Sequence, residues 1–461
     1  MLSKVRKPMV GLLSYKKNNY IHKIFSRMKQ LVLFVALLLA YSLSFAQETA
    51  IDAFLKAQPE IKSVEKIEGN DFFTSTYKIM VEQPLDHEHL EKGTFLQRVF
   101  VADKSQEGPV VFITEGYGAA YAGSPRYVNE LSPMLGASQI CVEHRYFGDS
   151  WPEPLNWDYL TVKNAAADHH RIVQIMKKYY GGKWVNTGIS KGGQTVVYHR
   201  WLYPDDVDVS IPYVAPLNFG VEDGRHEPFI ANIPGTAEQR KKILEFQTEI
   251  LKNRTVYLPK LKAFCEQQKF TFRISMDEVL DYCVLEYPFA LWQWGNLVNQ
   301  VPAADQDADS LFEHLMIVSN PSYFAIEGME GIQSFFVQAA RELGYYGYDT
   351  RPFKRYLSIK SAKNYLPKIF LPDDLKIRYD KKIAKQVKKF IDTTDAKILF
   401  VYGGWDPWFA SGFEVPQKNN LLRIVKEGGS HSARINNLPE AQKKIVKQTL
   451  EDWLQMKVNI E

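Results

Sequence analysis

Cysteine is scarce in this chain of 461 residues, which holds only three, too few for the disulfide framework of a small secreted domain. Glycine (27) and proline (23) are close to average, which excludes collagen-like and linker-like chains. With 45% hydrophobic and 24% charged residues, the chain does not have the composition of a disordered protein. The length allows either one large domain with an insertion or about two to three ordinary domains.

Metal and nucleotide motifs are also missing. No group of His, Cys, Asp and Glu residues has the spacing of a metal site. The glycine-rich segments match neither the dinucleotide-binding pattern nor the P-loop. The sequence therefore predicts a protein with no metal and no cofactor.

The apolar run 31–43 follows Lys29 and is too short for a comfortable membrane span. Small residues, Ser44 and Ala46, stand at the −3 and −1 positions of a cleavage site, as in a secretory signal peptide. The first residue of the mature chain would be Gln47. We expect an exported protein, periplasmic or secreted, with no stable membrane anchor after cleavage; an uncleaved anchor is the alternative.

The predicted leader, residues 1–46, is unusually long before its apolar run. Met28 is an alternative start, in which case residues 1–27 are an upstream extension. The leader holds eight basic residues and no acidic one, so the formal net charge of +4 becomes −4 without it. A mildly acidic mature chain gives no bulk support for nucleic-acid binding.

The three cysteines differ in their surroundings. Cys141 lies in an apolar, strand-like stretch and is expected to be a buried thiol without a role. Cys265 and Cys283 are 18 positions apart and flank a possible helix–turn–helix. They either form a disulfide, which would stabilise the fold by about 3 kcal/mol, or remain two free buried thiols.

Strand-like and helix-like segments alternate over the first half of the mature chain. Continuous apolar runs, typical of buried parallel strands, occur at 109–114, 138–143, 184–188 and 207–214, with helices expected at 162–180 and 194–202. This alternation predicts an α/β domain with a parallel sheet.

The alternation stops near Asn218. Helices are then expected at 236–251, 276–282, 332–343 and 376–391, strands return at 396–402 and 421–425, and a last helix covers 440–455. We therefore expect residues 47–217 and 396–461 to form two parts of one α/β core, with residues 218–395 inserted as a helical cap.

A Gly-x-Ser-x-Gly motif, Gly188-Ile189-Ser190-Lys191-Gly192, lies between a short strand and a helix. In this context the motif is typical of a nucleophile elbow, a strained turn that presents the serine hydroxyl above a sheet. The flanking glycines are needed because neighbouring backbone crowds both positions. Ser190 is therefore the predicted nucleophile.

A serine nucleophile needs a base, and the base needs an orienting acid. Asp406 follows the strand 396–402, and His431 follows the next strand, before the last helix. Serine, then aspartate, then histidine, each after a later strand, is the chain order of α/β-hydrolases. The sequence predicts an α/β-hydrolase fold with a mostly parallel sheet and a large inserted helical cap, with the catalytic triad Ser190, Asp406 and His431.

Two backbone amides are candidates for an oxyanion hole. The amide of Lys191 lies at the start of the helix that follows the elbow. A second donor should come from the loop after an earlier strand, where Glu115-Gly116-Tyr117-Gly118 places the Tyr117 N–H. The alternatives are a plain turn, or a Tyr117 that offers its ring or hydroxyl to substrate.

Several segments resemble two related groups of secreted serine peptidases. Val-Glu-His-Arg-Tyr-Phe-Gly-Asp-Ser at 142–150 and Trp-Asp-Pro-Trp at 405–408 are similar to the prolyl carboxypeptidase and dipeptidyl peptidase II group. Ser-Lys-Gly-Gly at 190–193 and Gly-Gly-Ser-His at 428–431 look closer to the Streptomyces-type secreted tripeptidyl aminopeptidase family. The first group usually has an aromatic residue after the serine, where this chain has Lys191.

Both groups are α/β-hydrolases with a helical cap, and both are exopeptidases. The resemblance implies an exopeptidase that acts on peptide substrates through an acyl-enzyme on Ser190, near the N-terminus of the peptide if the closer family is the better guide. Two other functions fit the same fold: a carboxylesterase or lipase, and a non-catalytic hydrolase-like binding protein. The charged cap argues against a lipase lid, and no triad residue is missing.

An aminopeptidase must also hold the free α-ammonium group of its substrate, which requires a carboxylate within reach of Ser190. The candidates are Glu115, Glu143, Glu222 and Asp223. Glu143 has an alternative role, a structural ion pair with Arg145. The aromatic stretch 287–294 either lines a substrate pocket or forms the core of the cap.

Overall fold

The computed structural model describes residues 49–460. The predicted leader, its cleavage site after Ala46 and the alternative start at Met28 lie outside the described residues. The chain divides after Phe54, and every element beyond α2 belongs to the unit Leu55–Glu461. Among the described residues, no helix combines the length and the apolar character that crossing a membrane requires.

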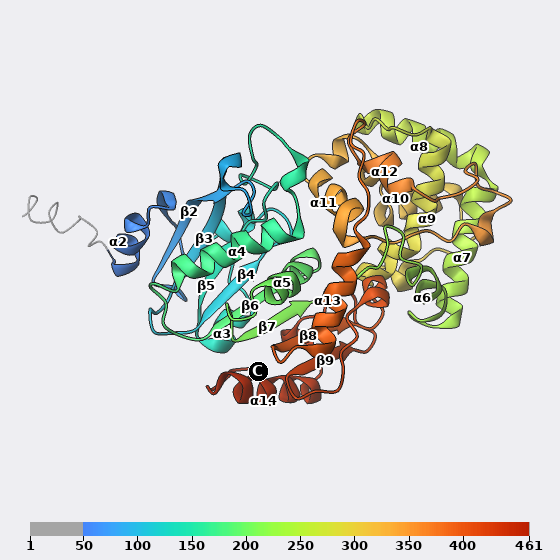
Figure 1. Cartoon of the computed structure of the whole chain (residues 1–461). Coiled ribbons are helices and arrows are strands. Elements are labelled where there is room, and N and C mark those ends of the chain that lie inside the picture. The colour runs from blue at the N-terminus through green and yellow to red at the C-terminus, as the bar shows by residue number, and fades with distance from the viewer. Residues whose placement is uncertain (1–48, 461) are drawn as a thin grey trace, which may run out of the picture. The chain divides into compact units, whose positions relative to one another are not determined.

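A nine-stranded sheet forms the centre of this unit (Figure 1). Its strands are β1 (Ile61–Ile67), β2 (Ser75–Pro84), β3 (Thr94–Asp103), β4 (Val110–Thr114), β5 (Ser138–Val142), β6 (Trp184–Ile189), β7 (Val209–Tyr213), β8 (Lys397–Gly403) and β9 (Leu421–Lys426). Their order across the sheet is β1-β2-β3-β5-β4-β6-β7-β8-β9. Neighbouring strands in the series β5-β4-β6-β7-β8-β9 pair in parallel. The pairs β1–β2, β2–β3 and β3–β5 are antiparallel.

The helices are α2 (Ala50–Ala57), α3 (Leu131–Leu135), α4 (Val162–Met176), α5 (Lys191–Leu202), α6 (His226–Asn232), α7 (Ala237–Lys252), α8 (Arg254–Gln268), α9 (Met276–Trp294), α10 (Ala308–Val318), α11 (Gln333–Gln338), α12 (Tyr365–Phe370), α13 (Lys381–Thr393) and α14 (Glu440–Leu454). A short π-helical turn, Ala339–Leu343, continues α11.

Helices cover both faces of the sheet, because successive residues of a strand point to opposite sides. In β8, Ile398 and Phe400 pack in the same core cluster as side chains of α4, α5 and α13. Leu399 and Val401 pack in a second cluster with side chains of α3 and α14. Two apolar faces explain why the parallel strands are continuously hydrophobic rather than alternating.

Between β7 and β8 the described chain contains helices but no strand of the sheet, and α7 to α10 gather beside the sheet (Figure 1). The predicted α/β-hydrolase fold, with its mostly parallel sheet and large inserted helical cap, is confirmed. The domain boundaries at 217/218 and 395/396 stay predictions. We use the name cap for residues 218–395.

Helix α9 is much longer than the predicted helix 276–282. A capping box between Ser275 and Glu278 begins it, and Gly295, with φ 75°, ends it after Trp294. The helix predicted from the sequence ended at Tyr282 because the segment after it is apolar on every face and contains Pro288, which lacks a backbone donor. Burial in the cap, where Tyr287, Phe289 and Trp292 are covered on all sides, carries the helix through the proline.

The three cysteines are all free and buried. Cys265 on α8 and Cys283 on α9 therefore do not form the disulfide that remained open from the sequence. Burial raises the pKa of the Cys265 thiol to about 11, so that it stays protonated at neutral pH.

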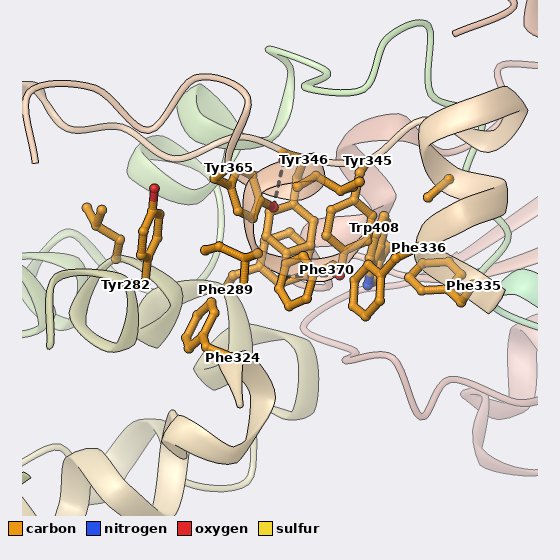
Figure 2. Close-up of a cluster of buried hydrophobic side chains, with 14 of the residues drawn as sticks. Tyr282, Phe289, Phe324, Phe335, Phe336, Tyr345, Tyr346, Tyr365, Phe370 and Trp408 are labelled. Atoms are coloured by element: carbon orange, nitrogen blue, oxygen red, sulfur yellow. Dashed lines mark hydrogen bonds between the residues drawn. The ribbon is translucent and has the colours of Figure 1, made fainter. Parts of the chain in front are cut away.

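An aromatic cluster fills the interior of the cap and reaches the loop after β8 (Figure 2). The ring of Trp408, two residues after Asp406, lies 5.2 Å from that of Phe289 and 5.3 Å from that of Tyr346. A carboxylate is enclosed in this cluster, because the hydroxyls of Tyr346 and Tyr348 both donate to Glu286, at 2.9 and 2.7 Å. The cap is thus packed directly against the segment that carries the predicted catalytic acid.

The enclosed carboxylate makes stability depend on pH. Burial raises the pKa of Glu286 to about 7 from 4.5, although the two tyrosine donors oppose the shift. The folded state then binds more protons than the unfolded state between these values, so stability falls as pH rises from about 4.5 to 7, by about 3 kcal/mol for a shift of this size.

Glu286→Gln should flatten this dependence. We expect the variant to lose less of its melting temperature between pH 5 and pH 8 than the wild type, as measured by thermal unfolding at both values. Some dependence should remain, because burial also raises the pKa of Glu342 to about 7. Equal losses in the two proteins would contradict the assignment of a proton to Glu286.

Candidate active site

Ser190 stands at the junction of β6 and α5 in a strained backbone conformation, with φ 58° and ψ −119°. A positive φ is uncommon for a residue with a side chain. A hydrogen bond holds this conformation of Ser190, since its backbone N–H donates to the Tyr213 carbonyl at 2.9 Å. A side chain at Gly188 would overlap the Gly192 carbonyl, and one at Gly193 would lie 2.7 Å from the Tyr213 oxygen. The segment therefore has the geometry of a nucleophile elbow.

Asp406 and His431 are paired. Asp406 follows β8, His431 follows β9, both are buried, and Asp406 Oδ2 lies 2.6 Å from His431 Nδ1. A carboxylate only accepts hydrogen bonds, so the proton of this bond belongs to Nδ1, and Nε2 is left with a free lone pair. The Trp408 N–H donates to Asp406 Oδ1 at 3.1 Å and fixes the carboxylate plane.

The three predicted triad residues follow strands that end at the same edge of the sheet. They follow β6, β8 and β9, which lie within four adjacent parallel strands, so their carboxyl ends point the same way. Ser190 is half-buried. Within residues 49–460, no hydrogen bond joins the Ser190 hydroxyl to His431. The structure supplies the pair and the elbow; the catalytic roles of the three residues stay a prediction.

The predicted oxyanion loop lies directly against the elbow. A side chain on Gly116 would come within 2.6 Å of the Gly192 nitrogen, so only glycine permits this approach. The buried Lys191 ammonium donates to the Gly116 carbonyl at 2.5 Å and lies 5.6 Å from the centre of the Tyr117 ring. Burial holds the pKa of Lys191 well below its usual value. Lys191 thus ties together the two segments whose amides are the candidate oxyanion donors.

Glu143 is fully engaged in the protein interior. Its Oε2 accepts from Arg98 and from the Ala119 N–H at 2.8 Å, and its Oε1 accepts from the Ser150 hydroxyl at 2.9 Å. These contacts favour a structural role over amine binding. The expected partner was wrong, because Arg145 instead forms a bidentate pair with Asp168, at 2.7 Å for both contacts.

The other three candidate carboxylates differ in the hydrogen bonds and ion pairs that they form within the protein. Asp223 is locked by Arg225, at 2.6 and 2.9 Å. Glu115, in the oxyanion loop, accepts from the Tyr121 hydroxyl, and burial raises its pKa. Glu222 accepts from a single donor among residues 49–460, the backbone N–H of Asn364. Of the four, Glu222 is therefore the least committed to the protein itself.

Sequence analysis missed Glu227, on α6. It lines a pocket of about 400 Å³ between α6, α7 and α9, and its Oε2 is buried with no hydrogen-bond partner in the described part of the chain. Burial raises its pKa, and the charges of Asp349, Asp223 and Glu222 raise it further. A side chain on Gly347 would lie 2.6 Å from Glu227 Oε1 and 3.5 Å from Glu222 Cβ, so the two glutamates flank the same glycine. No sequence motif marks Glu227, since the loop that presents Gly347 is about 120 positions away.

The aromatic stretch 287–294 divides between the two alternatives. Tyr287, Phe289 and Trp292 are buried in the core of the cap. Trp294, at the end of α9, is 57% exposed, and its ring meets that of His431 edge-on at 5.9 Å. The last residue of the stretch therefore reaches the candidate active site, while most of the others form the core.

An elbow serine and a buried histidine–aspartate pair at the ends of parallel strands define a hydrolase of the α/β-hydrolase class. Comparison with known proteins gives the group. The chain belongs to the peptidase S37 family, because the family model described as PS-10 peptidase S37 matches residues 50–459. The predicted serine exopeptidase is confirmed at this level.

Two relatives illustrate the similarity. The chain is 29% identical over 413 residues to the prolyl tri/tetrapeptidyl aminopeptidase of Streptomyces mobaraensis, an alignment that covers 87% of this chain and 83% of the relative. It is 25% identical over 203 residues to the lysosomal Pro-X carboxypeptidase of Bos taurus, with 40% and 41% covered. A solved structure of proline iminopeptidase from Mycobacterium smegmatis is 14% identical with a TM-score of 0.36, covering 82% of this chain and 99% of that one; a likeness this low carries no information on function.

Proposed function

We propose that this serine exopeptidase removes short peptides from the free N-terminus of peptide substrates. The observation that carries the proposal is the Asp406–His431 hydrogen bond of 2.6 Å at the same sheet edge as the strained Ser190, on a chain of the peptidase S37 family. The similarity to an aminopeptidase over most of both chains supports the N-terminal direction. We also propose that the protein is exported and released from its leader, and that it binds neither nucleic acid nor membrane.

The reaction proceeds through an ester on Ser190. The Ser190 oxygen attacks the peptide carbonyl carbon while His431 Nε2 takes its proton, and Asp406 holds the imidazolium. The Lys191 and Tyr117 amides hold the oxyanion. The carbon–nitrogen bond then breaks, and His431 returns the proton to the leaving amine. Water attacks the ester with the same histidine as base, which releases the short peptide as an acid and restores Ser190.

The substrate ammonium binds, in this proposal, at Glu222 and Glu227. Asp223 and Asp349 form salt bridges with Arg225 and Arg351, whereas within residues 49–460 neither of the two glutamates beside Gly347 forms one. A buried carboxylate oxygen without a hydrogen-bond partner, as at Glu227 Oε2, is costly, and an ammonium group would compensate it. The walls of the pocket support this placement, since Phe289 and Trp292 lie against the tryptophans on either side of Asp406, at 5.2 and 5.8 Å.

The test compares a tripeptidyl fluorogenic amide with a free amine, its N-acetylated form and a short acyl ester, using protein from Gln47 onward. We expect rapid release from the free-amine amide and at least about tenfold lower kcat/KM for the acetylated form, since a buried charge pair is lost. The Ser190→Ala variant, which lacks the nucleophile, gives the background rate for each substrate. Turnover of the ester alone would overturn the peptidase proposal in favour of an esterase.

Glu227→Gln tests the ammonium site. The variant should lose most of the preference for the free amine, chiefly through a higher KM, while the acetylated substrate changes little because it never used the charge. Glu313→Gln, an exposed glutamate on α10, is the matched control and should keep the preference. A Glu227→Gln protein that still discriminates as the wild type would exclude this residue from amine binding.

A further inference from the structure

A recess of about 430 Å³, lined by apolar side chains together with Asn296, lies where α9 ends and α10 passes beside it. Its lining includes Leu291, Trp294, Leu297, Ile317 and Val318. Trp294 and Ile317 are 57% and 62% exposed. Large apolar side chains gathered in one exposed hollow are unfavourable in water, so such a hollow is typical of a place where an apolar ligand binds.

The recess adjoins the loop that carries His431. The Trp294 ring meets the His431 imidazole edge-on, with the ring centres 5.9 Å apart. The backbone N–H of His431 donates to the backbone carbonyl of Gln293 at 2.8 Å. A side chain on Gly295 would lie 3.3 Å from Ser430 Cβ, so the end of α9 and the histidine loop are in contact over several residues. Trp294 therefore forms a wall shared by the recess and the histidine.

The proton transfers of His431 decide which part of a substrate lies next to Trp294. In acyl transfer to a serine, the same imidazole nitrogen that takes the serine proton gives it to the leaving amine. The leaving segment must therefore lie next to the imidazole, whereas the acyl segment stays attached to Ser190. A side chain at the start of the leaving segment would meet Trp294 first.

We propose that the recess binds the side chain of the residue directly after the scissile bond, and that it selects a large apolar one. The inference rests on the proposed function, because it presupposes peptide cleavage through Ser190. Trp294 from α9 and Ile317 from α10 both line the recess, so they determine specificity for the leaving residue and take no part in bond breaking.

The test varies only the leaving residue. Peptides Ala-Ala-Pro-Xaa-NH2 with a free amine carry Phe, Leu, Gly or Asp at Xaa, and the methyl ester of Ala-Ala-Pro has no leaving residue at all. We expect kcat/KM to be about 10- to 100-fold higher for Phe and Leu than for Gly, the range that an apolar pocket gives. If the wild type cleaves none of the peptides, the proposed function fails; if it cleaves all four equally, only the recess inference fails.

Two variants and one control locate the effect. Trp294→Ala should bring the Phe to Gly ratio down to within about threefold, with a larger loss on the Phe peptide than on the ester. Ile317→Arg, at an exposed position, should shift the preference toward Asp by about tenfold through charge attraction. Ile445→Ala, a half-exposed isoleucine on α14, should keep the wild-type ratio.

Equal losses of Trp294→Ala on the ester and on every peptide would mean that Trp294 only supports His431, which would overturn the inference. An unchanged Asp preference in Ile317→Arg would do the same. A second readout uses no peptide cleavage: Phe-NH2 added during ester hydrolysis should capture the acyl-enzyme at least about tenfold better than Gly-NH2, because the acceptor amine binds where the leaving residue departed.

Discussion

Ser190→Ala should lower kcat by about 10⁵-fold, equivalent to about 7 kcal/mol of transition-state stabilisation, because the variant has no oxygen on which the acyl-enzyme can form. Any residual rate would come from the oxyanion amides and from positioning alone. Binding should survive, since neither the proposed ammonium site nor the recess involves the Ser190 side chain. The measurement is steady-state kinetics on the free-amine amide, together with the dissociation constant of an uncleaved peptide.

Folding should also survive this substitution. Alanine and serine meet the same restriction at φ 58°, so the elbow gains no new strain. A melting temperature within a few degrees of the wild type would separate loss of the nucleophile from loss of the fold. A Ser190→Ala protein that kept more than about a tenth of the wild-type kcat would show that another residue carries the reaction.

Asp406→Asn should lower kcat by about 10⁴-fold near neutral pH, with little change in KM. The carboxylate accepts a hydrogen bond from His431 Nδ1 at 2.6 Å, and it also accepts one from the Trp408 N–H. Asparagine can keep the second bond with its oxygen, but its NH₂ group would then face Nδ1 and donate to it. Nε2 would carry the ring proton and could no longer act as a base.

The pH profile checks this explanation. Loss of the base should be partly relieved at high pH, where hydroxide can substitute for it, so the ratio of wild-type to variant rates should shrink as pH rises. Asp305→Asn, an exposed aspartate in the cap, is the matched control and should leave the profile unchanged. A variant that loses activity equally at every pH, with a lowered melting temperature, would point to a structural role for Asp406.

Much of the candidate site could be predicted from the sequence because each part depends on its immediate neighbours. The elbow at Ser190 needs glycines within three positions, a strand before it and a helix after it, and all of these can be read locally. Asp406 and His431 each follow a strand whose apolar run is continuous. Parallel strands put their carboxyl ends at one edge, so chain order alone places the three residues close together.

Parts of the fold escaped prediction where local signals conflicted or were weak. Strand β1 is largely exposed and polar, so it lacks the apolar pattern of a buried strand. Helices α8 and α10 also went unpredicted. Helix α9 was cut short at Tyr282 because proline and an all-round apolar sequence both argue against a surface helix, although burial in the cap makes them compatible with one.

The sequence by itself was enough to predict the chemistry: which side chain attacks, which orients and which transfers the proton, since these predictions depend on residue type and chain order. Only the tertiary structure could decide which residues come together around the proposed substrate sites. The pairing of Glu143 with Arg98, the approach of Glu222 and Glu227 to Gly347, and the position of Trp294 beside His431 all join residues that are about 45 to 140 positions apart. Such contacts are selected by packing of whole elements, a property that no short segment of the chain contains.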